Sequence, residues 1–275
     1  MSYASIILHV RPGPEGAGQL AAAVGLARRF EATLIGVGAE MFPPVVYDTG
    51  YAYVEGEVYV ALRESIDKNL AAAHDAFRAA TKDLRKPALW EAGLRPPAAA
   101  LALASRAADL VVAAPPPAGH SDPFRQAPPT ELVMTAGRPV FVVAPGGDAF
   151  KGERIVVAWK DTREARRALT DALPFLGRAH EVLVLEVCDK AETEDAAIRT
   201  RDVADALARH GCTARSLVVA SHGDDGHDIL HQASLFGADL IVAGAYGHSR
   251  LGEWAFGGVT RALLAQTTTH LLLSH

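Results

Sequence analysis

Glycines recur near the end of the chain at positions that favour the binding of an anion. In the stretch GAYGHSRLGEWAFGGVT they include Gly244, Gly247, Gly257 and Gly258, and Thr260 adds a hydroxyl. A glycine backbone reaches positive φ and allows close approach, so successive N–H groups can converge on one phosphate. Phosphate is therefore the ligand that this stretch suits best.

The surroundings of the loop support this interpretation. DLIVA, which ends at Ala243, has the continuous apolar character of a buried strand, and VTRALL after Gly258 is typical of a helix. Anions bind where a loop leaves the carboxyl end of a parallel strand and enters the N-terminus of a helix. His248, Ser249 and Arg250 would add polar side chains to such a site. The alternative is a structural loop, a tight turn that lets the helix pack on the strand.

An internal repeat contains the elements that position this loop. SIILHV (5–10) corresponds to RIVVAW (154–159), ADLVVAAP (108–115) to ADLIVAGA (238–245), and RPVFVVAP (138–145) to THLLLSH (269–275). The last two pairs share one offset along the chain, which indicates a duplication. Apolar runs separated by amphipathic stretches of helix length are typical of parallel strands covered on both faces. The sequence predicts two tandem α/β domains, each a five-stranded parallel sheet with helices on both faces.

The predicted elements can be placed by residue range. In the second half we expect strands at 154–159, 181–187, 213–219, 239–243 and 269–273, and helices at 162–176, 192–210, 226–236 and 258–265. In the first half, apolar residues recur every three or four positions from Val58 through Ile66 and Phe77 to Leu84, which predicts one long core-facing helix within the extra length at 41–86. The glycine-rich, charged segment 144–154 is the expected linker. The predicted domains therefore span 1–146 and 152–275.

The first half lacks the glycine loop. At the repeat offset, the four glycines correspond to Ala114, Pro117, Ala127 and Pro128. Proline has no N–H to donate and holds φ near −65°, so this segment cannot build the same anion site. We expect one phosphate site per chain, in the second half, and a first half that serves as a scaffold or a partner surface.

Composition excludes several functional classes. Lys and Arg number 27 against 32 Asp and Glu, so no basic field would attract nucleic acid or an anionic membrane. Cys188 and Cys212 form no CxxC motif, which favours a reducing compartment, and the first residues have no signal-peptide pattern. The expected location is the cytoplasm. Motifs of P-loop enzymes, dinucleotide-binding dehydrogenases and serine hydrolases are also missing from the sequence.

The spacing G-x2-G-x9-G formed by Gly244, Gly247 and Gly257 resembles the nucleotide-binding signature of the universal stress protein family. The resemblance extends over the whole chain and is closest to the tandem, two-domain form. It implies the strand order 3-2-1-4-5, ATP or AMP as the ligand, and a stress-response role as a sensor or binding protein. It also implies pairing through the last strands of the domains, within one chain or in a homodimer.

On this resemblance, the site combines the glycine loop with residues that follow the first strands of the second repeat: Trp159, Lys160, Asp161, Val187, Gly244, Gly247, His248, Gly257, Gly258, Val259 and Thr260. Lys160 stands where the family has an aspartate, and Gly258 where Ser or Thr is usual. Two alternatives stay open. One is a slow ATPase, in which Asp161 holds magnesium and Lys160 neutralises charge on phosphate. The other is an interaction module that has lost nucleotide binding. Magnesium is expected only together with ATP.

A second polar cluster, ASHGDDGHDILHQA (220–233), contains His222, His227 and His231. His227 and His231 would share one helix face and could share a metal ion. Aspartates that cap the start of a helix explain the same residues without a metal, and no second ligand pair of fixed spacing supports zinc. We therefore expect a helix start at this cluster. Thr162 or Asp161 is likewise expected to cap the helix that follows the first strand of the second half.

Overall fold

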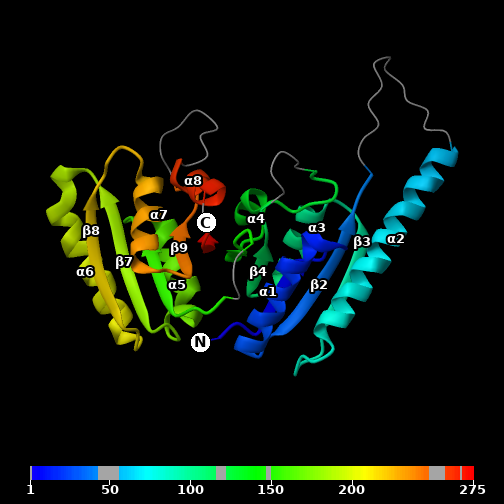
Figure 1. Cartoon of the computed structure of the whole chain (residues 1–275), viewed down its shortest axis with the longest axis horizontal. Coiled ribbons are helices and arrows are strands. Elements are labelled where there is room, and N and C mark those ends of the chain that lie inside the picture. Colours follow the sequence, from blue (N-terminus) through cyan, green and yellow to red (C-terminus); the bar gives the residue numbers. More distant parts are fainter. Residues whose placement is uncertain (1, 43–55, 116–121, 147–149, 248–257, 267) are drawn as a thin grey trace, which may run out of the picture. The chain divides into compact units, whose positions relative to one another are not determined.

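The chain folds into two compact α/β units. The computed structural model describes residues 2–42, 56–115, 122–146, 150–247, 258–266 and 268–275. One unit is Ala4–Ala136, and the other is Gly137–His275 with the first residues of the chain. Figure 1 shows that strands and helices alternate along the chain in both units. The units divide near residue 137, ahead of the glycine-rich segment that we expected to link two domains.

The first unit contains four strands and four helices in the described residues. The strands are β1 (Ser5–His9), β2 (Thr33–Glu40), β3 (Leu89–Leu94) and β4 (Leu110–Ala113). The helices are α1 (Pro14–Phe30), α2 (Gly56–Thr81), α3 (Pro97–Ala104) and α4 (Pro129–Thr135), and a short 3-10 helix, η1 (Ser105–Ala107), follows α3.

The second unit begins with β5 (Val140–Val142), the last strand of the first repeat. Its further strands are β6 (Arg154–Ala158), β7 (Glu181–Cys188), β8 (Ala214–Ala220), β9 (Leu240–Gly244) and β10 (His270–Ser274). The helices are α5 (Arg163–Leu176), α6 (Thr193–Arg209), α7 (Asp225–Phe236) and α8 (Gly258–Gln266), with the 3-10 helix η2 (Lys190–Glu192) ahead of α6.

The strand order within each unit matches the expected topology. The strands of the second repeat run β8-β7-β6-β9-β10, all parallel, which is the order 3-2-1-4-5. The first unit has the order β3-β2-β1-β4, also parallel. β5 pairs antiparallel with β10, with Phe141 opposite Leu272. The last strands of the two repeats therefore pair within one chain, as the family resemblance led us to expect.

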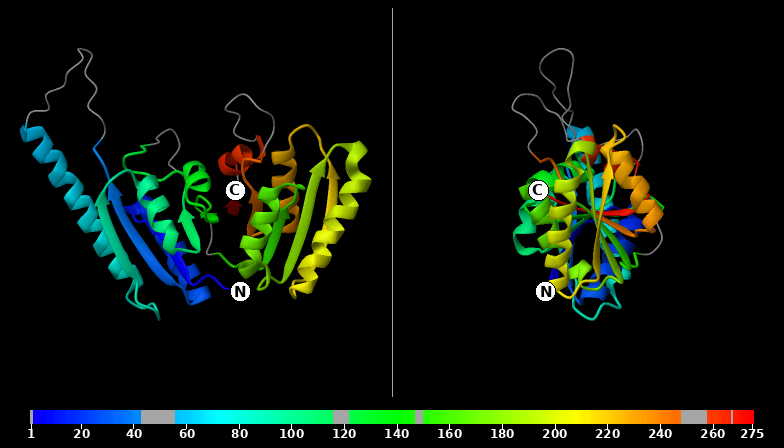
Figure 2. Two further views of the ribbon diagram at one scale, coloured as in Figure 1. Left: turned by 180° about the vertical axis from the view of Figure 1, so that it is seen from behind. Right: turned by 90° about the vertical axis from the view of Figure 1, so that its left-hand side faces the viewer.

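Helices cover both faces of the sheet in the second unit. The connections through α5 and α6 move away from β6, and the connection through α7 returns to its other side. Right-handed crossovers therefore place α7 opposite α5 and α6. Figure 2 shows α6 and α7 on opposite faces of the sheet. The central strands are accordingly buried on both faces, with Val156, Ile241 and Leu272 fully inaccessible to solvent.

The predicted elements of the second half are confirmed to within two residues at every boundary. The long first-half helix is also confirmed as α2, but its predicted core-facing stripe is wrong at both ends. Ile66 and Phe77 are buried at 3% exposure, whereas Val58 is 50% exposed and Leu84 lies beyond the end of the helix. Val58, Tyr59 and Val60 near the start of α2 are at least half-exposed, so apolar spacing alone overstated the buried length.

The duplication is visible in matching hydrogen bonds. In the first repeat, Asp109 Oδ2 accepts a hydrogen bond from the backbone N–H of Ala4 at 2.8 Å. In the second repeat, Asp239 Oδ2 accepts the corresponding bond from Glu153 N–H at 2.7 Å. The aspartate of each ADL segment thus ties the fourth strand of its repeat to the start of the first. No described helix combines the length and the apolar character needed to cross a bilayer.

Candidate functional site

The first glycine of the sequence motif ends β9 against the start of α5. A Cβ at Gly244 would lie 2.5 Å from the backbone nitrogen of Ala165 and 2.6 Å from the carbonyl carbon of Glu164. Such distances leave no room for any side chain, because both atoms belong to a helix backbone. Strand-to-helix packing therefore requires glycine at this position whether or not a ligand binds.

The other described glycines of the motif have more space. A Cβ at Gly247 would meet Glu164 Oε2 at 3.2 Å and Thr162 Oγ1 at 3.9 Å. At Gly258, the first residue of α8, a Cβ would have no atom within 4 Å. Packing does not require glycine at Gly258, whose surroundings are open. The predicted site residues His248 and Gly257 lie outside the described residues, as do Ser249 and Arg250.

The start of α5 forms one wall of the site. Thr162 caps this helix by accepting a hydrogen bond from Ala165 N–H at 3.3 Å, which confirms the expected cap. Asp161 accepts a hydrogen bond from Arg166 Nε at 3.1 Å and is half-exposed. Because this bond holds Asp161 to the side chain of Arg166, the carboxylate is directed along the helix.

A cavity of about 240 Å³ lies at the carboxyl ends of β6, β7 and β9, beside the starts of α5, α7 and α8. It is lined by Ala158, Trp159, Lys160, Thr162, Glu164, Ala165, Val187, Asp225, Ile229, Ala243, Gly244, Tyr246, Gly247, Gly258, Val259 and Thr260. The structure thus brings together the predicted residues Trp159, Lys160, Val187, Gly244, Gly247, Gly258, Val259 and Thr260. Asp161 is not among the lining residues.

Sequence reasoning missed the two acidic residues of the cavity. Glu164 is only 3% exposed, and its carboxylate pairs with Arg163. Burial alone would raise its pKa, but hydrogen bonds from Arg163, from its own backbone N–H and from Thr162 outweigh burial and lower it. Asp225 accepts a hydrogen bond from Ser221 Oγ at 2.5 Å. Acidic residues in the first turn of a helix are common, so their positions in the sequence gave no signal.

Two further lining residues offer polar groups. Trp159 is 7% exposed, and its buried indole N–H has no acceptor among the described residues. Thr260 is 4% exposed, and its hydroxyl lies 3.5 Å from the backbone nitrogen of Tyr246. An unsatisfied buried N–H costs about 1–3 kcal/mol, so the Trp159 indole carries an unused donor at the edge of this cavity.

The histidine cluster forms the predicted helix start. Asp224 caps α7 by accepting a hydrogen bond from His227 N–H at 3.0 Å. Asp228 Oδ1 lies 3.0 Å from His222 Nδ1, and hydrogen bonds from the His222 backbone lower the pKa of this carboxyl. Within the described ranges, no group of three or more His, Cys, Asp or Glu side chains is arranged to hold a metal ion.

Sequence comparison decides the family. The universal stress protein family matches residues 152–275, which include the motif and the whole cavity. Residues 152–275 therefore form a universal stress protein domain. No curated protein matches the sequence significantly.

Solved structures extend the likeness to the full length of the chain. A universal stress protein from Archaeoglobus fulgidus aligns with 98% of this chain and 95% of its own, at a TM-score of 0.66 and 14% identity. A putative universal stress protein from Pseudomonas aeruginosa aligns with 99% of this chain and 93% of its own, at a TM-score of 0.60 and 14% identity. At 14% identity this likeness shows the fold alone, and the shared fold extends over both halves of the chain.

Proposed function

We propose that this chain is a universal stress protein that binds an adenine nucleotide, or another small phosphate ligand, in its second half and acts as a stress-response sensor or binding protein. The proposal rests mainly on one observation. Lys160, Gly247 and the start of α8 at Gly258 and Thr260 come from three separate points in the sequence and line one cavity at the carboxyl ends of the strands. Ligands of open parallel sheets bind at this edge.

The lining divides into two kinds of wall. Trp159, Val187 and Ile229 offer apolar surface that suits a purine ring. Lys160 and the N-terminus of α8 at Gly258 offer positive charge and backbone N–H groups that suit a phosphate. A nucleotide that lies across the cavity would meet both walls.

The carboxylates of Glu164 and Asp225 limit the charge that the ligand can carry. Their two negative charges exceed the positive charge of Lys160, the single lysine among the described lining residues. A phosphate chain would therefore be attracted by Lys160 and repelled by the two carboxylates. We expect AMP to bind without metal, and we expect ATP to need Mg²⁺ to screen these carboxylates. Because Asp161 pairs with Arg166, any such Mg²⁺ would meet Glu164 or Asp225 rather than Asp161.

Calorimetric titration of the full chain with adenosine, AMP and ATP, each with and without Mg²⁺, tests this proposal. We expect AMP to bind in both conditions and ATP to bind more tightly when Mg²⁺ is present. Failure of all three ligands to bind at millimolar concentration would refute it and favour an interaction module. Release of phosphate from ATP, absent in a Lys160→Ala variant, would instead favour a slow ATPase.

The family resemblance adds a cytoplasmic location and a homodimer to the proposal. β10 is flanked by β9 and β5, so two chains cannot pair through that strand. A homodimer would use another surface. Light scattering of the purified chain measures its mass directly, and a monomeric mass at micromolar concentration would remove the dimer from the proposal.

A further inference from the structure

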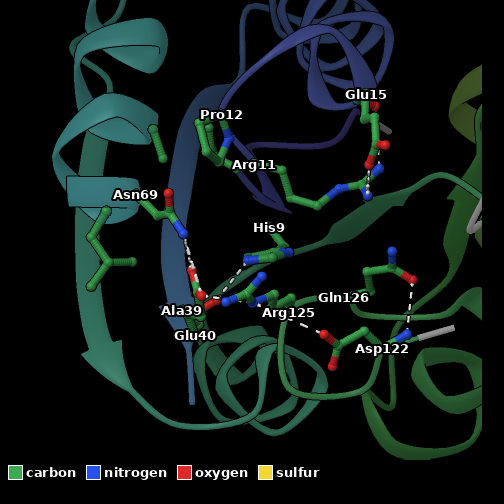
Figure 3. Close-up of a pocket in the computed structure, with 13 residues that line it drawn as sticks. His9, Arg11, Pro12, Glu15, Ala39, Glu40, Asn69, Asp122, Arg125 and Gln126 are labelled. Carbon is green, nitrogen blue, oxygen red and sulfur yellow. Dashed lines mark hydrogen bonds and ion pairs between the residues drawn. The ribbon is translucent and has the colours of Figure 1, made fainter. Parts of the chain in front are cut away.

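The first unit contains a cavity of its own at the carboxyl ends of β1 and β2. Its volume is about 300 Å³, and segment 122–126 and helix α2 close its sides (Figure 3). The polar residues that line it are His9, Arg11, Glu15, Glu40, Asn69, Asp122, Arg125 and Gln126. In the repeat, His9 and Arg11 correspond to Ala158 and Lys160, so the two halves present different chemistry at equivalent positions.

An ion pair between the buried Glu40 and the half-exposed Arg125 builds one wall of this cavity. Glu40 is 6% exposed and accepts hydrogen bonds from Asn69 Nδ2 at 3.0 and 3.3 Å, while Arg125 Nε lies 2.9 Å from its Oε1. Met41 N–H also donates to Phe124 O at 2.9 Å, which ties segment 122–126 to the end of β2. The Glu40 carboxylate therefore orients two side chains at the cavity and has no oxygen left unbonded.

His9 presents an unused acceptor. Its ring is 5% exposed, and Nε2 donates to the carbonyl of Ala39 at 2.9 Å, which fixes the tautomer. Burial lowers the pKa of His9 to about 4, so the ring is neutral at pH 7 and Nδ1 carries a lone pair. Nδ1 has no hydrogen-bond partner in the part of the chain that the structure describes. A donor on a ligand, in place of water, would satisfy it.

Arg11 presents a cation whose counter-ion is exposed, and its Nη2 also donates to the Glu15 carbonyl at 3.2 Å. Its side chain is 13% exposed, and its Nη1 lies 3.4 Å from Glu15, a carboxylate that is itself 63% exposed. Burial lowers the pKa of Arg11, with Glu15 offsetting this only in part. Arg199 in the second unit differs, because three bonds of 2.6 to 3.0 Å to Glu186 raise its pKa. The Arg11 guanidinium thus keeps donors for a further anionic group.

The surroundings favour a singly charged group over a phosphate. Pro128 and Pro129 stand at the end of the segment that replaces the glycine loop, where α4 begins, and neither offers an N–H. Glu15, Glu40 and Asp122 already outnumber the two arginines around the cavity. A single carboxylate fits the planar fork of Arg11, whereas a phosphate dianion would meet this excess of negative charge.

We propose that the first unit is a second ligand site, and that it binds a small hydroxycarboxylic acid. The carboxylate of the ligand pairs with Arg11, and a hydroxyl donates to Nδ1 of His9. Gln126 accepts from Asp122 N–H through Oε1 (Figure 3), and its amide N–H groups donate to the remaining hydroxyls of the ligand. The two halves of the chain then bind ligands of different chemistry at equivalent edges of their sheets.

Calorimetric titration of the full chain with D-gluconate, D-glucose and D-glucose 6-phosphate tests the ligand class. These probes share a polyhydroxylated chain and differ in carrying a carboxylate, no charge or a phosphate. Gluconate should bind at least tenfold more tightly than either of the others. No gluconate binding at 10 mM, or binding of glucose 6-phosphate as tight as that of gluconate, would overturn the proposal.

Variants and spectroscopy test the residues. Arg11→Gln should weaken gluconate binding about tenfold or more, because it removes a charge-assisted pair, whereas Arg85→Gln on the exposed surface should not change it. In the wild-type chain, gluconate should shift the ¹⁵N resonance of His9 Nδ1, a readout that stands even if Arg11→Gln fails to fold. An unmoved resonance, or unchanged affinity in a folded Arg11→Gln variant, contradicts the assignment.

The site is independent of the proposed nucleotide cavity, and one variant distinguishes them. Gly247→Val fills space beside Glu164 in the second half, whereas His9 and Arg11 belong to the first unit. Gluconate binding should survive in this variant even where nucleotide binding is lost. Loss of both would place gluconate in the second-half cavity and overturn the second site.

Discussion

Gly244 ends β9 with its Cβ position 2.5 Å from the backbone nitrogen of Ala165. The helix α5 begins against this strand end, and its first turn supplies Thr162 and Glu164 to the cavity. One close approach of two backbones therefore fixes the wall of the site. The first glycine of the motif is explained by packing, and only the later glycines bear on the ligand.

Gly244→Ala should destabilise the second unit by about 2 kcal/mol, because the added methyl forces strand and helix apart. Chemical denaturation measures the loss. Gly25→Ala is the matched control, since Gly25 lies in the exposed part of α1 with no atom within 4 Å of its Cβ position, and it should gain about 0.5–1 kcal/mol. Equal effects of the two changes would show that the close approach is relaxed in solution.

Gly247→Val should lower the affinity for AMP by tenfold or more while leaving the fold intact. The valine Cβ would lie 3.2 Å from Glu164 Oε2, and its methyl groups would occupy space in the cavity. Calorimetry gives the affinity, and circular dichroism checks the fold. Gly25→Val makes the same exchange away from the cavity and should leave AMP binding unchanged. Tight AMP binding by Gly247→Val would show that AMP binds outside this cavity.

Glu164→Gln should raise the affinity for ATP roughly tenfold without metal, because it removes a buried negative charge beside the phosphate wall. The affinity for adenosine should stay the same, since adenosine carries no phosphate. Glu194→Gln removes one charge from the exposed face of α6 and serves as the control. A parallel gain for adenosine would mean that Glu164 restricts the shape of the cavity rather than its charge.

The sequence predicted the second half closely because its strands are continuous apolar runs and its helices begin at caps. Thr162 and Asp224 both accept the expected hydrogen bonds at the starts of α5 and α7. The fold of the first half was predicted from its repeat relation to the second half. The structure shows this relation in the Asp109 bond to Ala4, which matches that of Asp239 to Glu153. These features depend on neighbours in sequence or on the repeat itself.

The cavities were harder to predict because they depend on elements far apart in the chain. In the sequence, Glu164 has the position of an ordinary first-turn carboxylate. Only the folded structure shows that its side chain lies next to Gly247 and therefore belongs to the site. His9 and Glu40 end two apolar strands, where an isolated polar residue gives no sign that segment 122–126 closes over both. The expectation that the first half is a scaffold rested on lost glycines and did not consider these side chains.

His9→Gln should flatten the dependence of stability on pH. The pKa of His9 is lowered from 6.5 to about 4, chiefly by burial and further by the charge of Arg11, so the unfolded chain takes up the proton first as the pH falls. His9 therefore contributes stability at neutral pH that is lost from about pH 6.5 downward and is gone below about pH 4. Between pH 8 and pH 5 the loss amounts to roughly 2 kcal/mol, and urea denaturation at each pH measures it. Glutamine keeps an N–H for the Ala39 carbonyl but does not titrate, and the other titrating groups cancel in the difference between the two chains. If the free energy of unfolding changed with pH in the same way in both proteins, His9 would not be held neutral in the folded chain. The proposed acceptor at Nδ1 would then be ruled out as well.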